Sequence, residues 1–91
     1  MADVIVTFKV MPKNVTVNLQ KVHSEIEDRI KHFGGTIGRI EEVPVAFGLK
    51  SLNIIFVMDE NIGSTEDLEK EITQIKGVGS VDVIDVRRAV G

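Results

Sequence analysis

The apolar positions along the chain form separate stretches whose spacing alternates between two periods. In the first stretch, residues 4–11, the polar positions Thr7 and Lys9 are two residues apart, and most of the others are β-branched or aromatic. Residues two apart lie on the same face of a strand. Pro12 then ends the stretch, because proline cannot continue the hydrogen-bond ladder inside a sheet. The pattern predicts a strand with one fully apolar face.

From Leu19 onwards the spacing is that of a helix. The apolar positions are three or four residues apart and form one stripe: Leu19, Val22, Ile26, Ile30 and Phe33. Asn18 is in position to cap the first turn, and Gly34-Gly35 follows the last apolar residue as a stop signal. We therefore predict an amphipathic helix of about 15 residues in this region.

The rest of the chain predicts three further strands and one further helix. Residues 36–43 are a weaker strand that ends at Pro44, and residues 49–58 are a strand with one face toward a core. Residues 64–67, Ser-Thr-Glu-Asp, combine capping hydroxyls with first-turn acids and start the second helix. The apolar stripe of this helix is Leu68, Ile72 and Ile75, and Gly77 ends it. Residues 78–88 form the last strand.

The predicted order is strand, helix, strand, strand, helix, strand. Each helix has a single apolar stripe, so both helices must bury their stripes on the same face of one sheet. We therefore predict an α+β fold, the ferredoxin-like two-layer sandwich (βαββαβ), with antiparallel strands in the order 4-1-3-2. The two most apolar strands, 4–11 and 49–58, take the central places in this order. The alternative is another two-layer α+β arrangement.

Composition narrows the class of protein. A length of 91 residues indicates one domain, residues 1–91. The net charge of -3 argues against nucleic acid or an anionic membrane as the main partner. The chain has no Cys, and its four Phe with no Trp or Tyr leave little for stacking on bases. No stretch resembles a membrane span or a secretion signal, so we expect a soluble cytoplasmic domain.

Signs of enzyme chemistry are sparse. His23 and His32 are nine residues apart and would lie on opposite sides of the first helix, so they cannot share a metal ion. Glu41-Glu42 would point to opposite faces of a strand and cannot act as an acid/base pair. The loop at Lys13-Asn14 lacks the arginine and glycines of an anion cradle. We predict no catalytic residues, no cofactor and no metal site.

Two features are not explained by the fold. Phe47 lies in the connector between Pro44 and Gly48, where a turn is normally polar. Its ring either packs back on the core or anchors a partner protein. Arg87-Arg88 forms a basic pair near the C-terminus, which is either a solvated tail or a functional charge. The acid-rich residues 59–71 are interpreted mainly as a solvated helix face with acids at its N-terminus.

Several segments resemble the archaeal elongation factor 1-beta family, and the resemblance covers the whole chain. The segment Pro44–Leu52, with the pattern Pro-x-x-Phe-Gly-Leu-Lys-x-Leu, is the most specific of them. The other segments on which the resemblance rests are Val10-Met11-Pro12, Thr65-Glu66-Asp67-Leu68 and Val78-Gly79-Ser80-Val81-Asp82-Val83. The resemblance implies a guanine nucleotide exchange factor for elongation factor 1-alpha, the GTPase that delivers aminoacyl-tRNA. Such a factor has no reaction of its own.

The resemblance also implies roles for individual residues. Arg88 falls where eukaryotic relatives have a lysine that is inserted near the Mg²⁺ of the GTPase, and Arg87 lies beside it. This is a departure from those relatives, since the residue is Arg and not Lys. Phe47 falls on an aromatic residue that docks into a hydrophobic pocket on the second domain of the GTPase, with Gly48 and Lys50 in the same partner-binding segment.

The predicted fold places these two groups at opposite ends of the sheet, roughly 25–30 Å apart for strands of eight or nine residues. One small domain could then span two domains of a partner. The alternative function is a small ferredoxin-like regulatory domain that dimerises through its sheet and binds a metabolite. That alternative would explain an apolar sheet but neither Phe47 nor the arginine pair.

Overall fold

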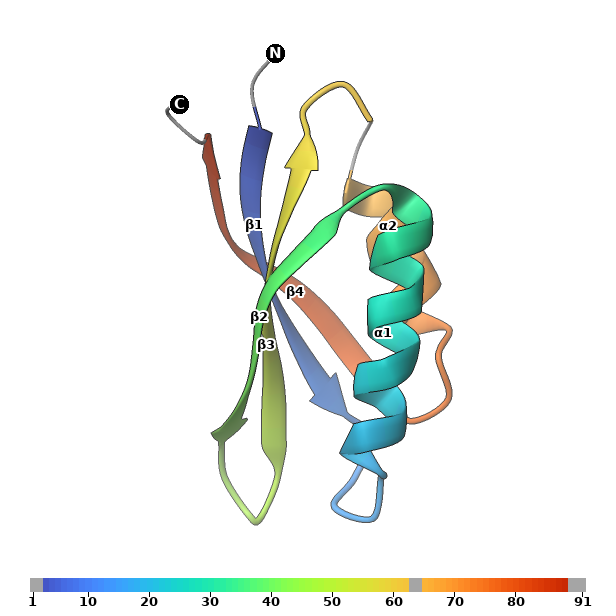
Figure 1. Cartoon of the computed structure of the whole chain (residues 1–91). Coiled ribbons are helices and arrows are strands. Elements are labelled where there is room, and N and C mark those ends of the chain that lie inside the picture. The colour runs from blue at the N-terminus through green and yellow to red at the C-terminus, as the bar shows by residue number, and fades with distance from the viewer. Residues whose placement is uncertain (1–2, 63–64, 89–91) are drawn as a thin grey trace.

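The computed structural model describes residues 3–62 and 65–88. Their elements follow the predicted order, as Figure 1 shows. The helices are α1 (Leu19–Phe33) and α2 (Thr65–Thr73); the strands are β1 (Asp3–Pro12), β2 (Thr36–Pro44), β3 (Lys50–Asp59) and β4 (Val78–Arg88). Strand ends agree with the predicted ones to within one residue. Ser64, part of the predicted start signal of the second helix, lies outside the described residues.

The four strands form one antiparallel sheet in the order β2-β3-β1-β4. Both helices lie on the same side of this sheet (Figure 1). The predicted ferredoxin-like sandwich is therefore confirmed, including the central places of β1 and β3. We call the side covered by α1 and α2 the helix-facing side and the other the open side.

The core lies between the helices and the two central strands. Alternate residues of β1 and β3 are buried there, and the rings of Phe8 and Phe56 meet edge to face with centroids 5.0 Å apart. They belong to the two strands that were predicted to turn one apolar face toward a core, which is confirmed. The helices add their apolar stripes: Val22, Ile26 and Ile30 from α1, Leu68 and Ile72 from α2. Burial of these side chains fixes both helices on one face.

The ends of α1 are the predicted ones. Asn18 Oδ1 accepts hydrogen bonds from the backbone N–H groups of Gln20 (3.0 Å) and Lys21 (3.4 Å), which are donors without a partner inside the helix. Gly34, at φ 104°, ends the helix in the left-handed conformation that favours glycine. The Asn18 cap and the glycine stop are confirmed.

The second helix is shorter than predicted. It ends at Thr73, so the prediction that Ile75 belongs to its stripe is wrong. Thr73 Oγ1 donates to the Glu69 carbonyl at 2.6 Å, and the N–H of Ile75 donates to the Ile72 carbonyl at 3.0 Å, a tighter turn than the α-helix. Ile75 is nevertheless buried, because this turn carries it onto the core.

The two outer strands are irregular where the central strands are regular. In β2 the register shifts between Ile37 and Arg39, so Gly38 is an extra residue. In β4 the register skips Ile84 and Gly79 opposite β1. The β1–β3 pairing has no such interruption. Extra residues of this kind are β-bulges, which bend and twist a strand locally.

Candidate functional site

The connector between β2 and β3 holds Phe47 in an unusual position. The side chain is 96% exposed, and the residue has φ 58°, beside Gly48 at φ 77°. The N–H of Leu49 donates to the carbonyl of Ala46 at 3.1 Å and closes a tight turn around them. Turns with positive φ at both central positions favour Asn-Gly, and a non-glycine residue there costs about 1–3 kcal/mol. The ring therefore lies in solvent, not on the core, and the hydrogen-bonded turn holds it there despite the backbone strain.

Two further apolar side chains are exposed at the same end of the molecule. Val45 in the connector is 45% exposed, and Val15 in the loop between β1 and α1 is 62% exposed. Val15 lies against the turn, since a Cβ placed on Gly48 would be 3.7 Å from Val15 Cγ1. We call Val15, Val45 and Phe47 the apolar tip. Exposed apolar groups that gather in this way mark contact sites for partner proteins.

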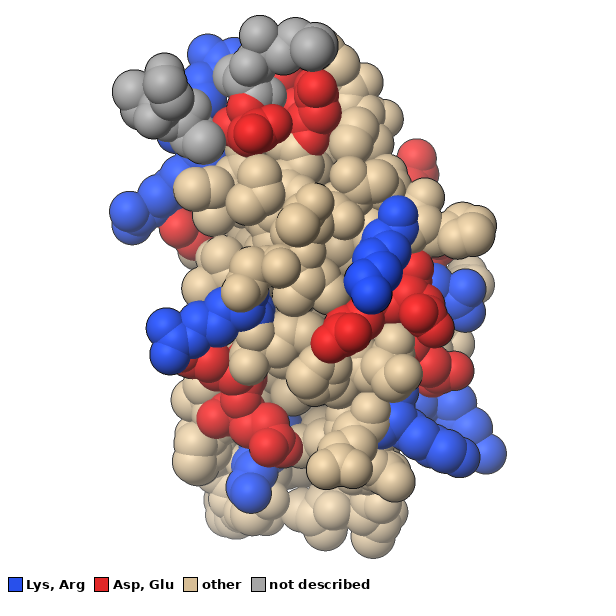
Figure 2. Space-filling model, in the orientation of Figure 1, with Lys and Arg blue, Asp and Glu red and all other residues tan. Residues whose placement is uncertain are grey.

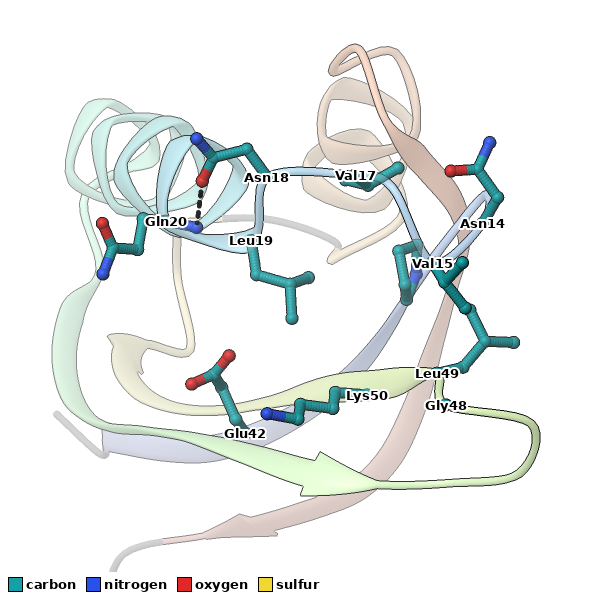
Figure 3. Close-up of a pocket in the computed structure, with 11 residues that line it drawn as sticks. Asn14, Val15, Val17, Asn18, Leu19, Gln20, Glu42, Gly48, Leu49 and Lys50 are labelled. Carbon is teal, nitrogen blue, oxygen red and sulfur yellow. Dashed lines mark hydrogen bonds between the residues drawn. The ribbon is translucent and has the colours of Figure 1, made fainter.

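A hollow of about 440 Å³ opens beside the apolar tip, between the loop before α1 and the ends of β2 and β3. Figure 3 shows Glu42 and Lys50 reaching into it from the strands, below Leu19 of the helix. The lining thus combines one cation, one carboxylate, the amide side chains of Asn14, Asn18 and Gln20, and an apolar wall. The carboxylate would repel a phosphate, so such a lining suits a polar side chain of a partner better.

The opposite end of the sheet carries the two arginines. Arg88 pairs with Val4 of β1 and lies on the helix-facing side, where its Nη2 is 2.5 Å from Glu60 Oε2. The hydrogen bond to Glu60, and then the charge of that carboxylate, raise the pKa of Arg88 above its ordinary value. Arg88 is therefore always protonated at physiological pH.

Arg87 has different surroundings from Arg88. It pairs with Ile5 and lies on the open side of the sheet. Its Nε is 2.9 Å from Asp85 Oδ2, two residues earlier on the same strand. Both arginines belong to β4, in agreement with the predicted strand 78–88, and both side chains are largely exposed to solvent.

The β2–β3 connector and the end of β4 lie at opposite ends of the molecule (Figure 1), so Phe47 and Arg88 are far apart, as predicted. Arg88 is level with Met58, because both pair with Val4, whereas Lys50 begins β3 at the hairpin. The stretch from Lys50 to Met58 spans about 26 Å at roughly 3.3 Å per residue. The longest dimension of the molecule is 42 Å.

The other candidate residues from the sequence do not come together in one site. His23 Nε2 is 2.6 Å from Glu27 Oε1 on the exposed side of α1, and the register puts Glu41 and Glu42 on opposite faces. Among residues 3–62 and 65–88, no three His, Cys, Asp or Glu side chains gather in a way that could hold a metal ion. In that same part of the chain, no helix is long and apolar enough to cross a membrane.

Charged side chains of both signs are interspersed over the face drawn in Figure 2, without a broad basic zone. A surface that binds nucleic acid through its phosphates would need such a zone.

Sequence reasoning missed Glu60 and Val15. Glu60 was included in the acid-rich residues 59–71 without a partner, but it bonds Arg88, a residue 28 positions away. No local pattern predicts a pair so distant in sequence. Val15 could have been suspected, because it is an apolar residue between the polar residues Asn14 and Thr16 of a loop.

Comparison with known proteins identifies the family. Residues 5–89 match the family described as the EF-1 guanine nucleotide exchange domain. The chain is 42% identical to elongation factor 1-beta of Methanothermobacter thermautotrophicus over 88 residues, which cover 97% of this chain and 98% of the relative. Elongation factor 1-beta of Sulfurisphaera tokodaii is 38% identical, with 97% of each chain covered.

Solved structures agree on the fold alone. The ACT domain from the GTP pyrophosphokinase of Chlorobium tepidum has a TM-score of 0.64 at 17% identity, covering 90% of this chain and 99% of that one. The C-terminal domain of MgtC from Mycobacterium tuberculosis has a TM-score of 0.62 at 18% identity, covering 98% and 88%.

The fold, the exposed ends and the family match together define a guanine nucleotide exchange domain. The chain belongs to the EF-1 guanine nucleotide exchange domain family, and its role is nucleotide exchange in translation elongation. The resemblance seen in the sequence is thereby confirmed.

Proposed function

We propose that the protein promotes the exchange of GDP for GTP on elongation factor 1-alpha, and so regenerates the form that binds aminoacyl-tRNA. The family and the relatives named elongation factor 1-beta support this partner. The protein acts in the cytoplasm, where elongation takes place, and performs no bond chemistry itself. The observation that carries the proposal is the placement of an exposed ring, Phe47, and a cation, Arg88, at opposite ends of one rigid sheet.

Exchange requires differential binding. The factor must bind the GTPase with weakened nucleotide more tightly than the GTPase with nucleotide in place. A ~1000-fold faster release corresponds to about 4 kcal/mol moved from nucleotide binding into protein–protein contacts. A domain that contacts its partner at two distant points can supply this energy, because one contact holds the complex while the other disturbs the nucleotide site.

The apolar tip is the contact that holds the complex together. Phe47 is presented by a strained turn and needs no rearrangement of the core to enter a hydrophobic recess on the partner. Val15 and Val45 flank it, and Gly48 and Lys50 complete the docking end. A rigid aromatic side chain loses little conformational entropy on binding, which is why such residues dominate interface energies.

Arg88 is the contact that disturbs the nucleotide site of the GTPase. In a GTPase, Mg²⁺ bridges the phosphates of the nucleotide and neutralises their charge. A guanidinium brought close to this ion repels it and competes for its carboxylate partners, which weakens nucleotide binding. Arg87 is the weaker candidate, because it lies on the open side of the sheet, opposite to Arg88.

A metabolite-binding regulatory domain is not retained as an alternative. It explains neither the exposed Phe47 nor the family match. The similarity to an ACT domain, at 17% identity, extends to the fold only.

The test is a stopped-flow measurement of fluorescent GDP leaving elongation factor 1-alpha. Substoichiometric amounts of the protein should accelerate the release in the presence of excess unlabelled nucleotide, and the protein alone should hydrolyse no GTP. A release rate that stays unchanged at saturating protein would contradict the proposal.

A further inference from the structure

Arg88 is not free in the unbound protein. Its Nη2 donates to Glu60 Oε2 at 2.5 Å. Arg88 is the last residue of β4 and Glu60 directly follows β3, and these two strands do not pair with each other. Both strands pair with β1. Strands on either side of a third are about 10 Å apart. The Arg88 side chain therefore reaches across the end of β1 to meet the carboxylate.

The Glu60–Arg88 ion pair changes the charge that a partner meets at this end of the sheet. A guanidinium with a carboxylate at hydrogen-bond distance has most of its charge compensated locally. Repulsion of a nearby Mg²⁺ by Arg88 is then cancelled by attraction to Glu60. The charge of Arg88 becomes effective only when the ion pair opens.

The Glu60–Arg88 ion pair is also weak enough to open. The side chains of Arg88 and Glu60 are 70% and 32% exposed, and ion pairs of this kind contribute little to stability. Glu60 lies in the loop that follows β3, outside the helices and strands. Carboxylates around the partner's metal site could therefore replace Glu60 as the partner of Arg88.

We propose that Glu60 is a positioning residue for nucleotide exchange, one that holds and neutralises Arg88 in the free protein and yields it to the acidic metal site of the docked GTPase. This inference rests on the proposed function of Arg88. It adds a step before exchange, the opening of the Glu60–Arg88 pair, and assigns that step to a residue outside the docking end.

The structure offers a matched control on the same strand. Arg87 and Asp85 form an ion pair of similar exposure on the open side, with Nε and Oδ2 2.9 Å apart. Asp85→Asn removes one carboxylate beside one arginine, as Glu60→Gln does, and changes the net charge equally. A general effect of charge would therefore appear in both variants.

The experiment measures GDP release from elongation factor 1-alpha at saturating factor and low salt. The proteins compared are the wild type, Glu60→Gln, Arg88→Ala, the double variant and Asp85→Asn. We expect Glu60→Gln to exceed the wild-type maximal rate about two- to fivefold, the range that corresponds to an exposed pair. The concentration of the factor that gives half of the maximal release rate should change little. The gain should disappear at high salt, which screens the pair in the wild type, and in the Arg88→Ala background. Asp85→Asn should equal the wild type.

The outcomes separate this inference from the function on which it rests. A wild type that does not accelerate release overturns both. An active wild type with Glu60→Gln at an equal or lower rate overturns the role of Glu60 alone, as does the same gain in the Arg88→Ala background. A gain in Asp85→Asn equal to that in Glu60→Gln also overturns it, since the effect would then be one of net charge.

Discussion

Arg87 and Arg88 are neighbours in the sequence but lie on opposite sides of the sheet, each with an acidic partner of its own. Arg87 pairs with Ile5 on the open side and bonds Asp85, whereas Arg88 pairs with Val4 on the helix-facing side and bonds Glu60. Because β4 continues regularly through both residues, a partner that approaches one side meets only one of them. This makes the two arginines separable by mutation.

We expect Arg88→Ala to lower the maximal rate of GDP release on the order of tenfold or more, because the charge that disturbs the nucleotide site is removed. Arg88→Lys should keep most of the activity, because the role requires a positive charge more than a planar group. Arg87→Ala is the matched control and should lose much less. Stopped-flow release of labelled GDP distinguishes these variants, and a wild-type rate for Arg88→Ala would show that another residue carries the charge.

Phe47→Ala should weaken binding to elongation factor 1-alpha by about 2 kcal/mol or more, as loss of a buried interface aromatic does. The melting temperature should not fall, since the ring contacts solvent and not the core. Titration calorimetry and thermal unfolding measure the two effects separately. Phe56→Ala provides the contrast, because removing a core ring should cost about 3–5 kcal/mol of stability.

Phe47→Gly should stabilise the isolated domain while it abolishes the docking contact. Glycine adopts φ 58° without the steric penalty that phenylalanine pays, but it loses more conformational freedom on folding, so the net gain should be about 1 kcal/mol. Urea unfolding measures this difference directly. A loss of stability in the glycine variant would mean that the exposed ring contributes to folding after all.

Removal of Mg²⁺ should reduce the advantage of the wild type over Arg88→Ala. When the ion has already been chelated, there is no metal for the guanidinium to repel. We therefore expect the two release curves to converge in excess EDTA and to separate in millimolar Mg²⁺. If the ratio of their rates is the same in both buffers, Arg88 acts on the GTPase by a route that does not involve the metal.

Asn18→Ala should cost about 1 kcal/mol of unfolding free energy, because two N–H groups at the start of α1 lose their acceptor. Gln20→Ala, an exposed substitution in the same turn, should change stability by less than about 0.5 kcal/mol. Chemical denaturation of both variants gives the comparison. Equal stabilities would show that water replaces the Asn18 side chain at no cost.

Much of the fold could be predicted because local patterns and burial agree. The Leu19–Phe33 stripe, its Asn18 cap and its glycine stop all indicate one helix, and the structure contains that helix. The error at Ile75 has a physical cause. Apolar spacing alone cannot distinguish a further helical turn from a tight turn that buries the same residue.

The site was less accessible to sequence reasoning. The exposure of Phe47 depends on the backbone conformation of a four-residue turn, and the sequence allowed a ring packed on the core equally well. The partner of Arg88 depends on which strands meet at one end of the sheet, and Glu60 is distant in the sequence. Contacts of this kind appear only after the chain has folded.

The irregular outer strands have a consequence for the protein at high concentration. The two rims of the sheet are formed by β2 and β4, where the extra residues Gly38 and Ile84 interrupt an even row of amide and carbonyl groups. A bulge twists an edge strand and makes it a poorer template for the strand of a second chain. The rims of the sheet are thus protected against edge-to-edge pairing at these points, in a protein that also exposes a phenylalanine at its tip.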